Sequence, residues 1–284
     1  MGLGLIGGSV ARAAVGGAGI GRVTAWTPSG AGPAAAAAHG IVPARRLEDA
    51  VDGADLVVLA APPLACLDLL DRLAEPETRT LLGSRAVVTD VASTKAEIVA
   101  RARKHRIRFV GGHPMAGREA SGWASSDPSL LADRPWVVVP PAPEDAEAMA
   151  RIDALISICG AHAVRLDAPA HDRAVASISH VPLVVSAALA EASTGPGWDV
   201  ARTLVAGGWQ SMTRVARGDP AMAAGIVATN RDPVRAGLAR VRDTIDDWIR
   251  AIDGAGTVDA GTELESRFRA ARRRLEDGGG HDGA

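Results

Sequence analysis

The pattern of apolar and polar positions changes near residue 167. Before that point, short runs rich in β-branched residues alternate with alanine-rich stretches that are typical of helices. Runs such as LVVLA and VVV are apolar at successive positions, which is typical of strands whose sheet is covered by helices on both faces. We therefore predict a doubly wound α/β domain over residues 1–167. Its expected strands lie at 23–26, 56–60, 86–90, 108–110, 136–139 and 163–166.

From residue 168 onward the pattern predicts helices only, so residues 168–284 are expected to form a second, all-helical domain. Its first helix is long and apolar, and Pro182 is expected to bend or interrupt it. The apolar surface of these helices exceeds what a helical domain of this size can easily bury by itself, which favours a homodimer formed through this domain. The expected helices lie at 171–193, 198–206, 220–229, 233–252 and 263–275.

The glycines at the start of the chain have the GxGxxG spacing, at Gly2, Gly4 and Gly7, and a run that favours a helix follows them. In such a loop the first glycine allows a tight turn, the second lets the backbone approach a pyrophosphate, and the third lets the helix pack on a strand. The helix N-terminus then faces the phosphates, so the backbone at Leu5 and Ile6 is expected to contribute to binding. The loop predicts a Rossmann-like domain that binds NAD or NADP.

Two parts of this predicted cofactor site depart from the usual arrangement. The glycine loop normally follows the first strand of the sheet, but only Met1 precedes Gly2, so this strand is expected to be missing or truncated. The acidic residue that usually binds the adenosine ribose is not found after the second expected strand, where Thr27 and Ser29 offer hydroxyl groups instead. A hydroxyl group can bind a ribose or a 2′-phosphate. NAD is therefore the first expectation, and NADP stays open.

Charge and composition narrow the function classes. The chain has 31 basic and 33 acidic side chains and a formal net charge of −2, whereas a nucleic-acid or membrane-surface binder usually carries a basic face. The apolar start of the chain resembles a signal sequence, but it contains Arg12 and several glycines, which suit a membrane helix poorly. Cys66 and Cys159 lack metal-ligand spacing. We expect a cytoplasmic protein without a metal site that acts on a small molecule and binds neither nucleic acid nor membrane.

Three polar motifs follow expected strands or lie in the helical part. They are DVASTK at 90–95, GGHPMAGREASG at 111–122, and HD at 171–172 with SHVP at 179–182. Together with the glycine loop they resemble the prephenate and arogenate dehydrogenase family of tyrosine biosynthesis, over residues 2–249. The resemblance implies an NAD(P)-dependent enzyme that oxidatively decarboxylates prephenate to 4-hydroxyphenylpyruvate. Arogenate or amino-deoxyprephenate is the alternative substrate.

The expected chemistry centres on His113, which follows a strand and precedes Pro114 in a loop with glycines on both sides. An imidazole titrates near neutral pH and suits a general base. The resemblance implies that His113 removes the proton of the substrate's ring hydroxyl and that Ser93 hydrogen-bonds the same hydroxyl. Ser93 is also well placed to cap the helix that follows it. Lys95, one of two lysines, is either a site residue or an exposed lysine in the first turn of that helix.

The resemblance also implies a set of substrate-binding residues. Arg214, in a TRxAxxDP pattern, is expected to pair with the ring carboxylate, for which a guanidinium has matching geometry. Glu119 is expected near the substrate or on a solvated loop. His180 either lines the site or packs as a hydrogen-bonded helix histidine. His171, with Asp172, is expected to have a structural role at the start of a helix.

Three positions depart from the family's pattern. Leu183 stands where a second histidine is frequent, Ser211 where an aspartate is frequent, and Ala223 where a tryptophan is frequent. All three are expected around the side chain of the substrate rather than at the carbon that releases hydride. The hydride chemistry is therefore expected to be retained, whereas the choice among prephenate, arogenate and an amino analogue stays open.

Two other functions compete with this interpretation. β-Hydroxyacid dehydrogenases share a glycine loop and a helical second domain, but they use a lysine on a helix as acid and base, and this chain has no lysine after Lys104. A protein that binds NAD(P) without turnover is the alternative from a different class. The shortened first strand favours that alternative, and His113 with Ser93 argues against it.

Overall fold

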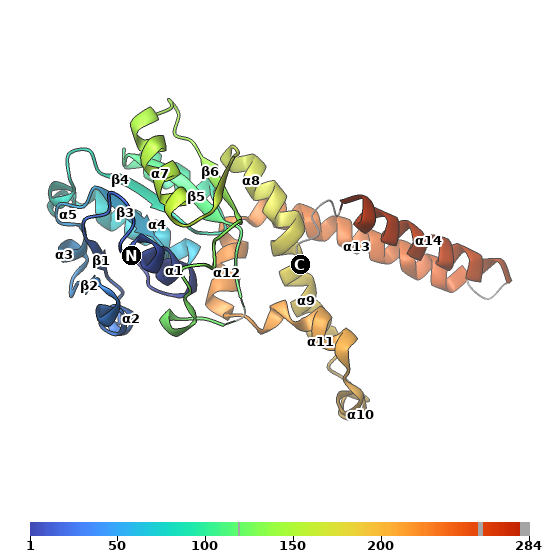
Figure 1. Cartoon of the computed structure of the whole chain (residues 1–284). Helices are drawn as coiled ribbons and strands as arrows, with labels where there is room; N and C mark the ends of the chain where they lie inside the picture. The colour runs from blue at the N-terminus through green and yellow to red at the C-terminus, as the bar shows by residue number, and fades with distance from the viewer. Residues whose placement is uncertain (119, 255–257, 279–284) are drawn as a thin grey trace. The chain divides into compact units, whose positions relative to one another are not determined.

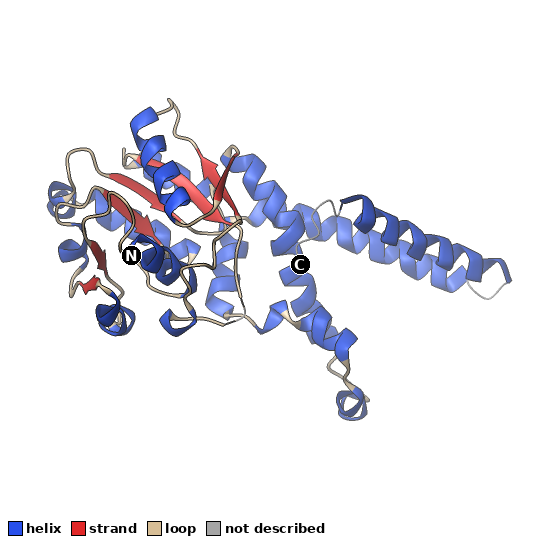
Figure 2. Cartoon of the chain, viewed as in Figure 1, coloured by secondary structure: helices blue, strands red, loops and turns tan. Residues whose placement is uncertain are grey.

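The chain is described from a computed structural model, which covers residues 1–118, 120–254 and 258–278. It divides into two compact units, Met1–Val234 and Arg235–Ala284, and each is described by itself. Every strand among the described residues lies between residues 23 and 165, and only helices and turns follow (Figure 2). This order agrees with the predicted change from an α/β pattern to a helical pattern near residue 167.

The first unit contains two groups of hydrogen-bonded strands (Figure 1). The strands are β1 (Val23–Ala25), β2 (Ile41–Pro43), β3 (Leu56–Leu59), β4 (Val87–Asp90), β5 (Phe109–Pro114), β6 (Pro135–Val139) and β7 (His162–Arg165). Strands β3 to β7 form one sheet in sequence order, and β1 pairs with β2 in a separate parallel ladder. The β5–β6 ladder is antiparallel, with Gly112 opposite Val138, and the other described ladders are parallel. The six predicted strands are present, whereas β2 and the direction of β6 were not predicted.

The start of the chain takes the place of a strand between β1 and β3. The Met1 amine donates to the carbonyl of Val58 at 2.8 Å, and the carbonyl of Met1 accepts from the N–H of Ala60 at 2.7 Å. On the other side, the N–H of Gly2 donates to the carbonyl of Trp26 at 2.9 Å. Beside these bonds, a cavity of about 340 Å³ lies between β1 and β3. The sheet is therefore split where a doubly wound fold has its central strand.

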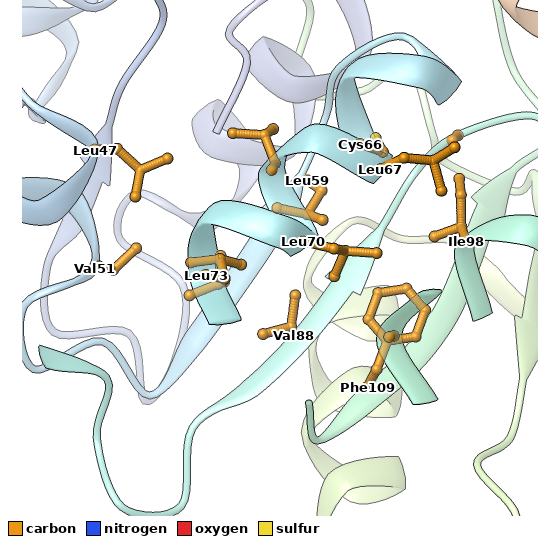
Figure 3. Packing of buried hydrophobic residues seen from close by; sticks show 14 of the residues in the cluster. Leu47, Val51, Leu59, Cys66, Leu67, Leu70, Leu73, Val88, Ile98 and Phe109 are labelled. Atoms are coloured by element: carbon orange, nitrogen blue, oxygen red, sulfur yellow. The ribbon is translucent and has the colours of Figure 1, made fainter. Parts of the chain in front are cut away.

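Helices cover both faces of the larger sheet, as expected for a doubly wound domain. They are α1 (Leu5–Ala14), α3 (Leu47–Val51), α4 (Pro63–Ala74), α6 (Ala96–Lys104) and α7 (Ala146–Ile158), with the short helices α2 (Ala31–Ala36) and α5 (Pro76–Leu81) at the margins. On one face, Leu67 and Leu70 of α4 pack in a core with Val88 (Figure 3). On the other face, Val10 of α1 lies in a core with Val87. Val87 and Val88 serve opposite cores because side chains alternate across a strand.

Residues 168–192 form one continuous helical segment with an irregular turn. It consists of α8 (Ala168–Val175), a π-helical turn η3 (Ala176–His180) and α9 (Val181–Ala192). Pro182 lies in the first turn of α9 and has no N–H to donate to the preceding turn, which accounts for the irregularity. The predicted interruption at Pro182 is therefore a change of helical hydrogen bonding without a break in the segment.

Five helical elements follow α9 in the first unit, and the last of them returns to the α/β part. They are α10 (Trp198–Ala201), η4 (Arg202–Leu204), α11 (Gly207–Thr213), η5 (Val215–Arg217) and α12 (Pro220–Thr229). Helix α12 packs against α4, and α8 packs against α6. The first compact unit thus extends past the last strand to Val234. The division into compact units therefore differs from the division by sequence pattern, which falls where the strands end.

The second unit contains most of α13 (Arg231–Asp253) and all described residues of α14 (Val258–Gly278). The rings of Trp248 and Phe268 are 4.7 Å apart and connect the two helices. The guanidinium of Arg267 lies 5.9 Å from the Trp248 ring centre. These contacts make the second unit a pair of helices joined by aromatic packing.

Candidate active site

The three glycines of the GxGxxG loop have three different environments. Gly2 has a φ of +87°, and a Cβ atom there would lie 2.1 Å from the carbonyl oxygen of Ala60. A Cβ atom on Gly7 would lie 2.4 Å from the carbonyl oxygen of Gly2, so α1 can approach the start of the chain only with glycine here. Gly4 faces open space. The tight turn, the open approach and the close helix packing are the arrangement that a pyrophosphate site requires.

The first turn of α1 is open to a ligand. Gly4 is its N-cap residue, and no side chain caps the helix. The first N–H groups of an α-helix have no partner within the helix and carry a partial positive charge. The backbone at Leu5 and Ile6 therefore suits an anion. A nucleotide cofactor fits this cradle, because a side chain at Gly2 or Gly7 would close it and the face at Gly4 is free of neighbours within 4 Å.

The predicted ribose-binding residues lie in the turn after β1. The Thr27 hydroxyl accepts from the N–H of Gly30 at 3.1 Å, and Ser29 is exposed. Thr27 is therefore held by its own turn, and its side chain is half-buried. Two hydroxyl groups are available in this turn, and it carries no charged side chain.

Arginines that the sequence analysis did not single out lie close to this turn. The guanidinium of Arg72 lies 5.2 Å from the ring centre of Trp26, which follows β1 directly. Arg72 pairs with Glu48 at 3.5 Å, and Arg46 pairs with the same carboxylate at 3.1 Å. Arg46 and Arg72 come from separate segments, so their sequence positions give no sign that they share a partner. Glu48 is therefore shared by two cations beside the predicted adenosine region.

A second tryptophan borders the glycine loop. Trp123 lies in the short helix η2 (Trp123–Ser125), which contacts α1. The guanidinium of Arg12 lies 4.0 Å from its ring centre, and Arg12 also donates to the hydroxyl of Ser126 at 2.8 Å. The segment after β5 is thereby held against the helix that follows the glycine loop.

A buried ion pair supports the carboxyl ends of β4 and β5. Asp90, the last residue of β4, pairs with the ammonium group of Lys95, and both side chains are fully buried. The Asp90 carboxylate also accepts from the N–H of Ala92 at 3.1 Å and of Gly112 at 3.0 Å. A Cβ atom on Gly112 would lie 2.5 Å from the carbonyl oxygen of Asp90, which explains the glycine. The alternative of an exposed Lys95 is therefore wrong.

Ser93 lies in the loop between β4 and α6 and is half-buried. Helix α6 begins at Ala96, with Lys95 as its N-cap residue. The N–H groups of Lys95 and Ala96 each donate to the Asp172 carboxylate at 2.8 Å. The expectation that Ser93 caps this helix is therefore wrong, because a carboxylate from α8 occupies the helix start.

His113 is connected to a buried histidine–aspartate pair. His113 lies near the end of β5, directly after Gly111 and Gly112, and its Nδ1 lies 2.8 Å from Nε2 of His171. On the far side of that ring, His171 Nδ1 lies 2.8 Å from the Asp172 carboxylate. The side chains of His171 and Asp172 are buried, whereas His113 is half-buried. Burial lowers the pKa of His113 well below its ordinary value, and the nearby charges of Lys95, His171 and His180 lower it further.

His180 occupies the end of the π-helical turn and is almost completely buried. The side-chain amide of Asn230 lies 3.0 Å from its Nδ1 and also donates to the carbonyl of Asp172 at 2.8 Å. Burial lowers the pKa of His180 to about 4. The structure therefore places His180 among hydrogen-bonded helix residues, as one of the two expectations had it. Asn230 was missed, because no motif marks it.

Arg214 is exposed at the junction of α11 and η5. Its segment is tied to α9, since the Ser186 hydroxyl donates to the carbonyl of Met212 at 2.9 Å and η5 packs against α9. The segment that carries Arg214 is thereby connected to the helix that begins just after His180. Glu119 lies outside the described residues.

The described side chains of the His113 region can perform proton transfer. The neutral imidazole of His113 lies near the end of β5 and contacts His171. The buried ion pair of Lys95 and Asp90 lies behind it. Among the described residues, no group of His, Cys, Asp and Glu could hold a metal ion. Sequence reasoning missed Asn230, gave Asp90 no role although it begins the DVASTK motif, and gave Asp172 only a structural role. A signal existed for Asp90, which ends an expected strand at the edge where sites form in α/β domains.

Comparison with known proteins identifies the family to which the chain belongs. The family model described as "Prephenate dehydrogenase, nucleotide-binding domain" matches residues 22–165, and the one described as "Prephenate dehydrogenase, dimerization domain" matches residues 167–265. The chain belongs to the prephenate dehydrogenase family. The predicted resemblance and the predicted fold class, a Rossmann-like nucleotide-binding domain followed by a helical dimerisation domain, are therefore confirmed.

Curated members of the prephenate dehydrogenase family are similar over most of the chain. Prephenate dehydrogenase of Bacillus subtilis is 32% identical over 275 residues, covering 94% of this chain and 71% of that protein. Prephenate dehydrogenase of Lactococcus lactis is 31% identical and covers 62% of this chain and 49% of its own length. A protein of Streptomyces niveus named as a probable prephenate dehydrogenase is 31% identical and covers 81% and 63%. The chain thus spans about half to seven tenths of these relatives.

Solved structures share the fold. Arogenate dehydrogenase of Synechocystis is 27% identical, with a TM-score of 0.75 and coverage of 96% of this chain and 98% of that chain. Prephenate dehydrogenase of Aquifex aeolicus, solved with hydroxyphenyl propionate and NAD+, is 24% identical, with a TM-score of 0.82 and coverage of 97% and 96%. The second likeness shows the fold alone.

Proposed function

We propose that this protein oxidatively decarboxylates prephenate, with NAD as the hydride acceptor. The observation that carries the proposal is the neutral imidazole of His113, held at the end of β5 by a hydrogen bond to a buried histidine. A base that is unprotonated at neutral pH suits the removal of a hydroxyl proton. Family membership and the Bacillus subtilis relative support the same reaction class.

The glycine cradle would hold the cofactor. Gly2, Gly4 and Gly7 shape the loop, and the N–H groups at Leu5 and Ile6 would face the pyrophosphate. A bound nicotinamide supplies the acceptor for hydride. Thr27 and Ser29 would bind the adenosine ribose. NAD is favoured over NADP because Arg46 and Arg72, the nearby cations, both pair with Glu48 and are not free to take a 2′-phosphate.

The side chains divide the chemistry between them. His113 takes the proton of the ring hydroxyl, which raises the electron density on the carbon that releases hydride. Ser93 hydrogen-bonds the same oxygen, and its hydroxyl is not needed to cap α6. The ring carboxylate then leaves as CO2, and its bonding electrons make the ring aromatic. The ring oxygen recovers a proton from His113, so the base returns to its starting state.

Arg214 would bind the ring carboxylate until it leaves. Its guanidinium matches a carboxylate in geometry and charge. The proposal for Arg214 rests on its sequence pattern and on its segment, which is tied to α9. Glu119 and His180 are proposed as further residues around the substrate. Since Leu183, Ser211 and Ala223 depart from the family's pattern around the substrate side chain, arogenate is the second candidate substrate, and the arogenate dehydrogenase fold of Synechocystis supports keeping it.

We also propose a homodimer formed through the helical part. Only 28% of the most apolar window of Ala168–Ala192 is buried in the single chain, although its mean hydropathy is 1.5. By length and composition this segment could cross a membrane, but it carries the buried polar side chains of His171, Asp172 and His180. Exposed apolar residues such as Ile178 and Leu204 then need a protein partner. The matched dimerization domain supports a second copy of this chain, in a protein that we expect in the cytoplasm.

The test is an absorbance assay of nicotinamide reduction with prephenate or arogenate, each with NAD or NADP. We expect the fastest reduction with prephenate and NAD. The H113N variant is expected to lower kcat by about 10²-fold or more, the scale of general-base catalysis, with an unchanged Kd for NAD. Circular dichroism establishes that both proteins are folded. A folded wild-type protein that reduces neither cofactor with either substrate would refute the proposal.

A further inference from the structure

We propose that His171 and Asp172 are positioning residues that hold the proton of His113 on Nδ1 and leave Nε2 as the basic atom. The inference rests on the proposed role of His113 as the base. It assigns a function to two residues whose expected role was only to start a helix. The hydrogen bonds His113–His171 and His171–Asp172, both 2.8 Å long, carry the argument.

The direction of the two hydrogen bonds follows from the carboxylate. Both Asp172 oxygens accept from backbone N–H groups, so we assign the bond from His171 to this carboxylate the direction from Nδ1–H to oxygen. We assign His171 a single ring proton, which leaves a lone pair on Nε2 that can only accept. His113 must therefore donate from Nδ1. The remaining ring nitrogen of His113, Nε2, is left with the lone pair that a general base requires.

Two backbone groups hold the Asp172 carboxylate in place. The N–H groups of Lys95 and Ala96 donate to its two carboxylate oxygens at 2.8 Å each. These groups belong to the start of α6, where the helix dipole favours a negative charge. The carboxylate is also within a buried region, so its charge is not screened by water. The chain of bonds is thus anchored at its far end by a fixed acceptor.

The helix start does not need these two residues. Asp167 is the N-cap residue of α8, and its side chain accepts from the N–H of Ala170 at 2.6 Å. His171 and Asp172 lie in the next turn and point their polar atoms to His113 and to α6. The start of α8 therefore does not by itself account for the contacts of these two residues. A capping role belongs to Asp172 as well, but for α6 and not for its own helix.

The titratable groups around His113 come from several elements. Lys95 precedes α6, His171 is on α8, and His180 is on η3. The Lys95 cation is neutralised by Asp90, and His180 is kept uncharged near neutral pH by burial, since its pKa is lowered to about 4. Asp172 is thus the negative charge placed to compensate a proton that His113 acquires on Nε2. The pair stabilises the protonated base as well as its orientation.

The experiment compares H171Q with H171L. A glutamine can accept from His113 through its carbonyl oxygen and donate to Asp172 through its amide, whereas leucine has similar bulk and can do neither. We expect H171L to lower kcat/KM by about 10²-fold and H171Q to stay within about 10-fold of the wild type. The Kd for NAD is expected to stay unchanged in both. Asp172 is not replaced, because its loss would also uncap α6.

A second readout needs no turnover. Nitrogen-15 NMR of the histidine rings in the wild-type protein, without substrate, identifies which ring nitrogen of His113 carries the proton. We expect the proton on Nδ1 in the wild type and in H171Q, and a shift toward the Nε2 form in H171L. H113N serves to assign the His113 signals. This readout also stands if the H171L protein fails to fold, since the wild-type result alone tests the assignment.

The outcomes separate this inference from the proposed function. A wild-type His113 that carries its proton on Nε2 overturns the inference, as does a folded H171L protein with wild-type kcat/KM. If the wild type turns over none of the substrates but His113 has its proton on Nδ1 and loses this preference in H171L, the positioning role holds and the proposed reaction does not. Rescue by glutamine but not by leucine supports the inference directly.

Discussion

Two parts of the α/β domain differ in how many hydrogen bonds hold them: the carboxyl ends of β4 and β5, and the gap between β1 and β3. At the carboxyl ends of β4 and β5, Asp90 has three hydrogen-bonding partners and Asp172 has three. Between β1 and β3, the start of the chain makes a few backbone bonds, and a cavity of about 340 Å³ lies beside it. The proposed proton-transfer site is therefore held by many contacts, and the proposed cofactor cradle by few.

Because of this difference, we expect proton transfer and cofactor binding to depend on different parts of the domain. The polar cluster draws its groups from β4, β5, α6 and α8, so it does not need the strand that β1 and β3 lack. The glycine loop depends on that position directly, because the N–H of Gly2 bonds to Trp26 and the carbonyl of Gly2 lies close to Gly7. We expect changes in the cluster to alter stability and turnover, and changes at the start of the chain to alter cofactor binding.

The largest effect is expected from breaking the buried ion pair. K95M removes the cation and leaves the Asp90 carboxylate buried with its backbone donors only. Removing one partner of a buried pair costs about 3–5 kcal/mol. Urea denaturation measures this loss in the free energy of unfolding. The loss should shrink at low pH, where Asp90 can take up a proton and no longer carries an unpaired charge.

An exposed ion pair provides the matched control. R46M removes one of the two arginine partners of Glu48 at the surface, and such pairs contribute about 0–1 kcal/mol. Equal losses in K95M and R46M would contradict the importance given to burial in the cluster.

The second effect concerns pH and separates the two regions. Burial lowers the pKa of the Met1 amine from 8.0 to about 6, so its contribution to stability is present above pH 8 and is lost as pH falls through this range. The pKa values of His113 and His180 are lowered from 6.5, the latter to about 4, so their contribution is lost only below about pH 6.5. For the Met1 amine and for His180, each loss is on the order of 3 kcal/mol.

Thermal unfolding followed from pH 9 to pH 4 should therefore show two declines. Acetylation of the Met1 amine removes the titrating group and should abolish the first decline while leaving the second. A single decline confined to the range below pH 5 would contradict the burial of both groups.

The third effect concerns the gap between β1 and β3. An appended segment of five alternating valine and isoleucine residues can pair with both strand edges and place apolar side chains in the cavity. We expect a rise in Tm of several degrees, since about 1 kcal/mol corresponds to roughly 2–4 °C for a protein of this size. The control is an appended Gly/Ser segment of equal length. A rise that is equal for both segments would attribute the effect to removal of the Met1 charge.

The smallest effect concerns cofactor choice. E48A removes the carboxylate shared by Arg46 and Arg72, which lie beside the turn at Trp26. The freed guanidinium groups can then bind a 2′-phosphate. We expect the Kd for NADP to fall by about 10-fold with little change for NAD, measured by fluorescence titration. An unchanged Kd for NADP would indicate that the adenosine end of the cofactor does not bind beside Arg46 and Arg72.

The sequence was sufficient for features that depend on local spacing. The six predicted strands follow from apolar runs, and the distinct environments of Gly2, Gly4 and Gly7 agree with the roles that their spacing predicts. His113 was singled out as an imidazole in a loop after a strand, but the structure places it within β5, opposite Val137 of β6. These features need few contacts between distant residues.

The features that were missed depend on contacts between distant segments. The His113–His171 contact joins residues that are 58 positions apart, and the bond from Lys95 to Asp172 spans 77 positions. Lys95 is an exception, since its partner Asp90 is only five positions away. It was considered as an exposed residue because lysines are rarely buried, and local spacing does not indicate burial. Ser93 was expected to cap α6 because it lies just before this helix. The carboxylate that occupies the helix start comes from α8, 77 positions away from Lys95, and local spacing could not reveal it.

The surroundings of Trp26 and Trp123 have an optical consequence. The chain contains six tryptophans and no tyrosine, so its ultraviolet fluorescence comes from indole groups. Trp26 follows β1, and Trp123 is held against α1, so both border the region that we assign to the cofactor. Indole emission overlaps the absorption of a reduced nicotinamide, which permits energy transfer between them. The protein therefore carries its own label for cofactor binding, and quenching of this light can report occupancy without any added dye.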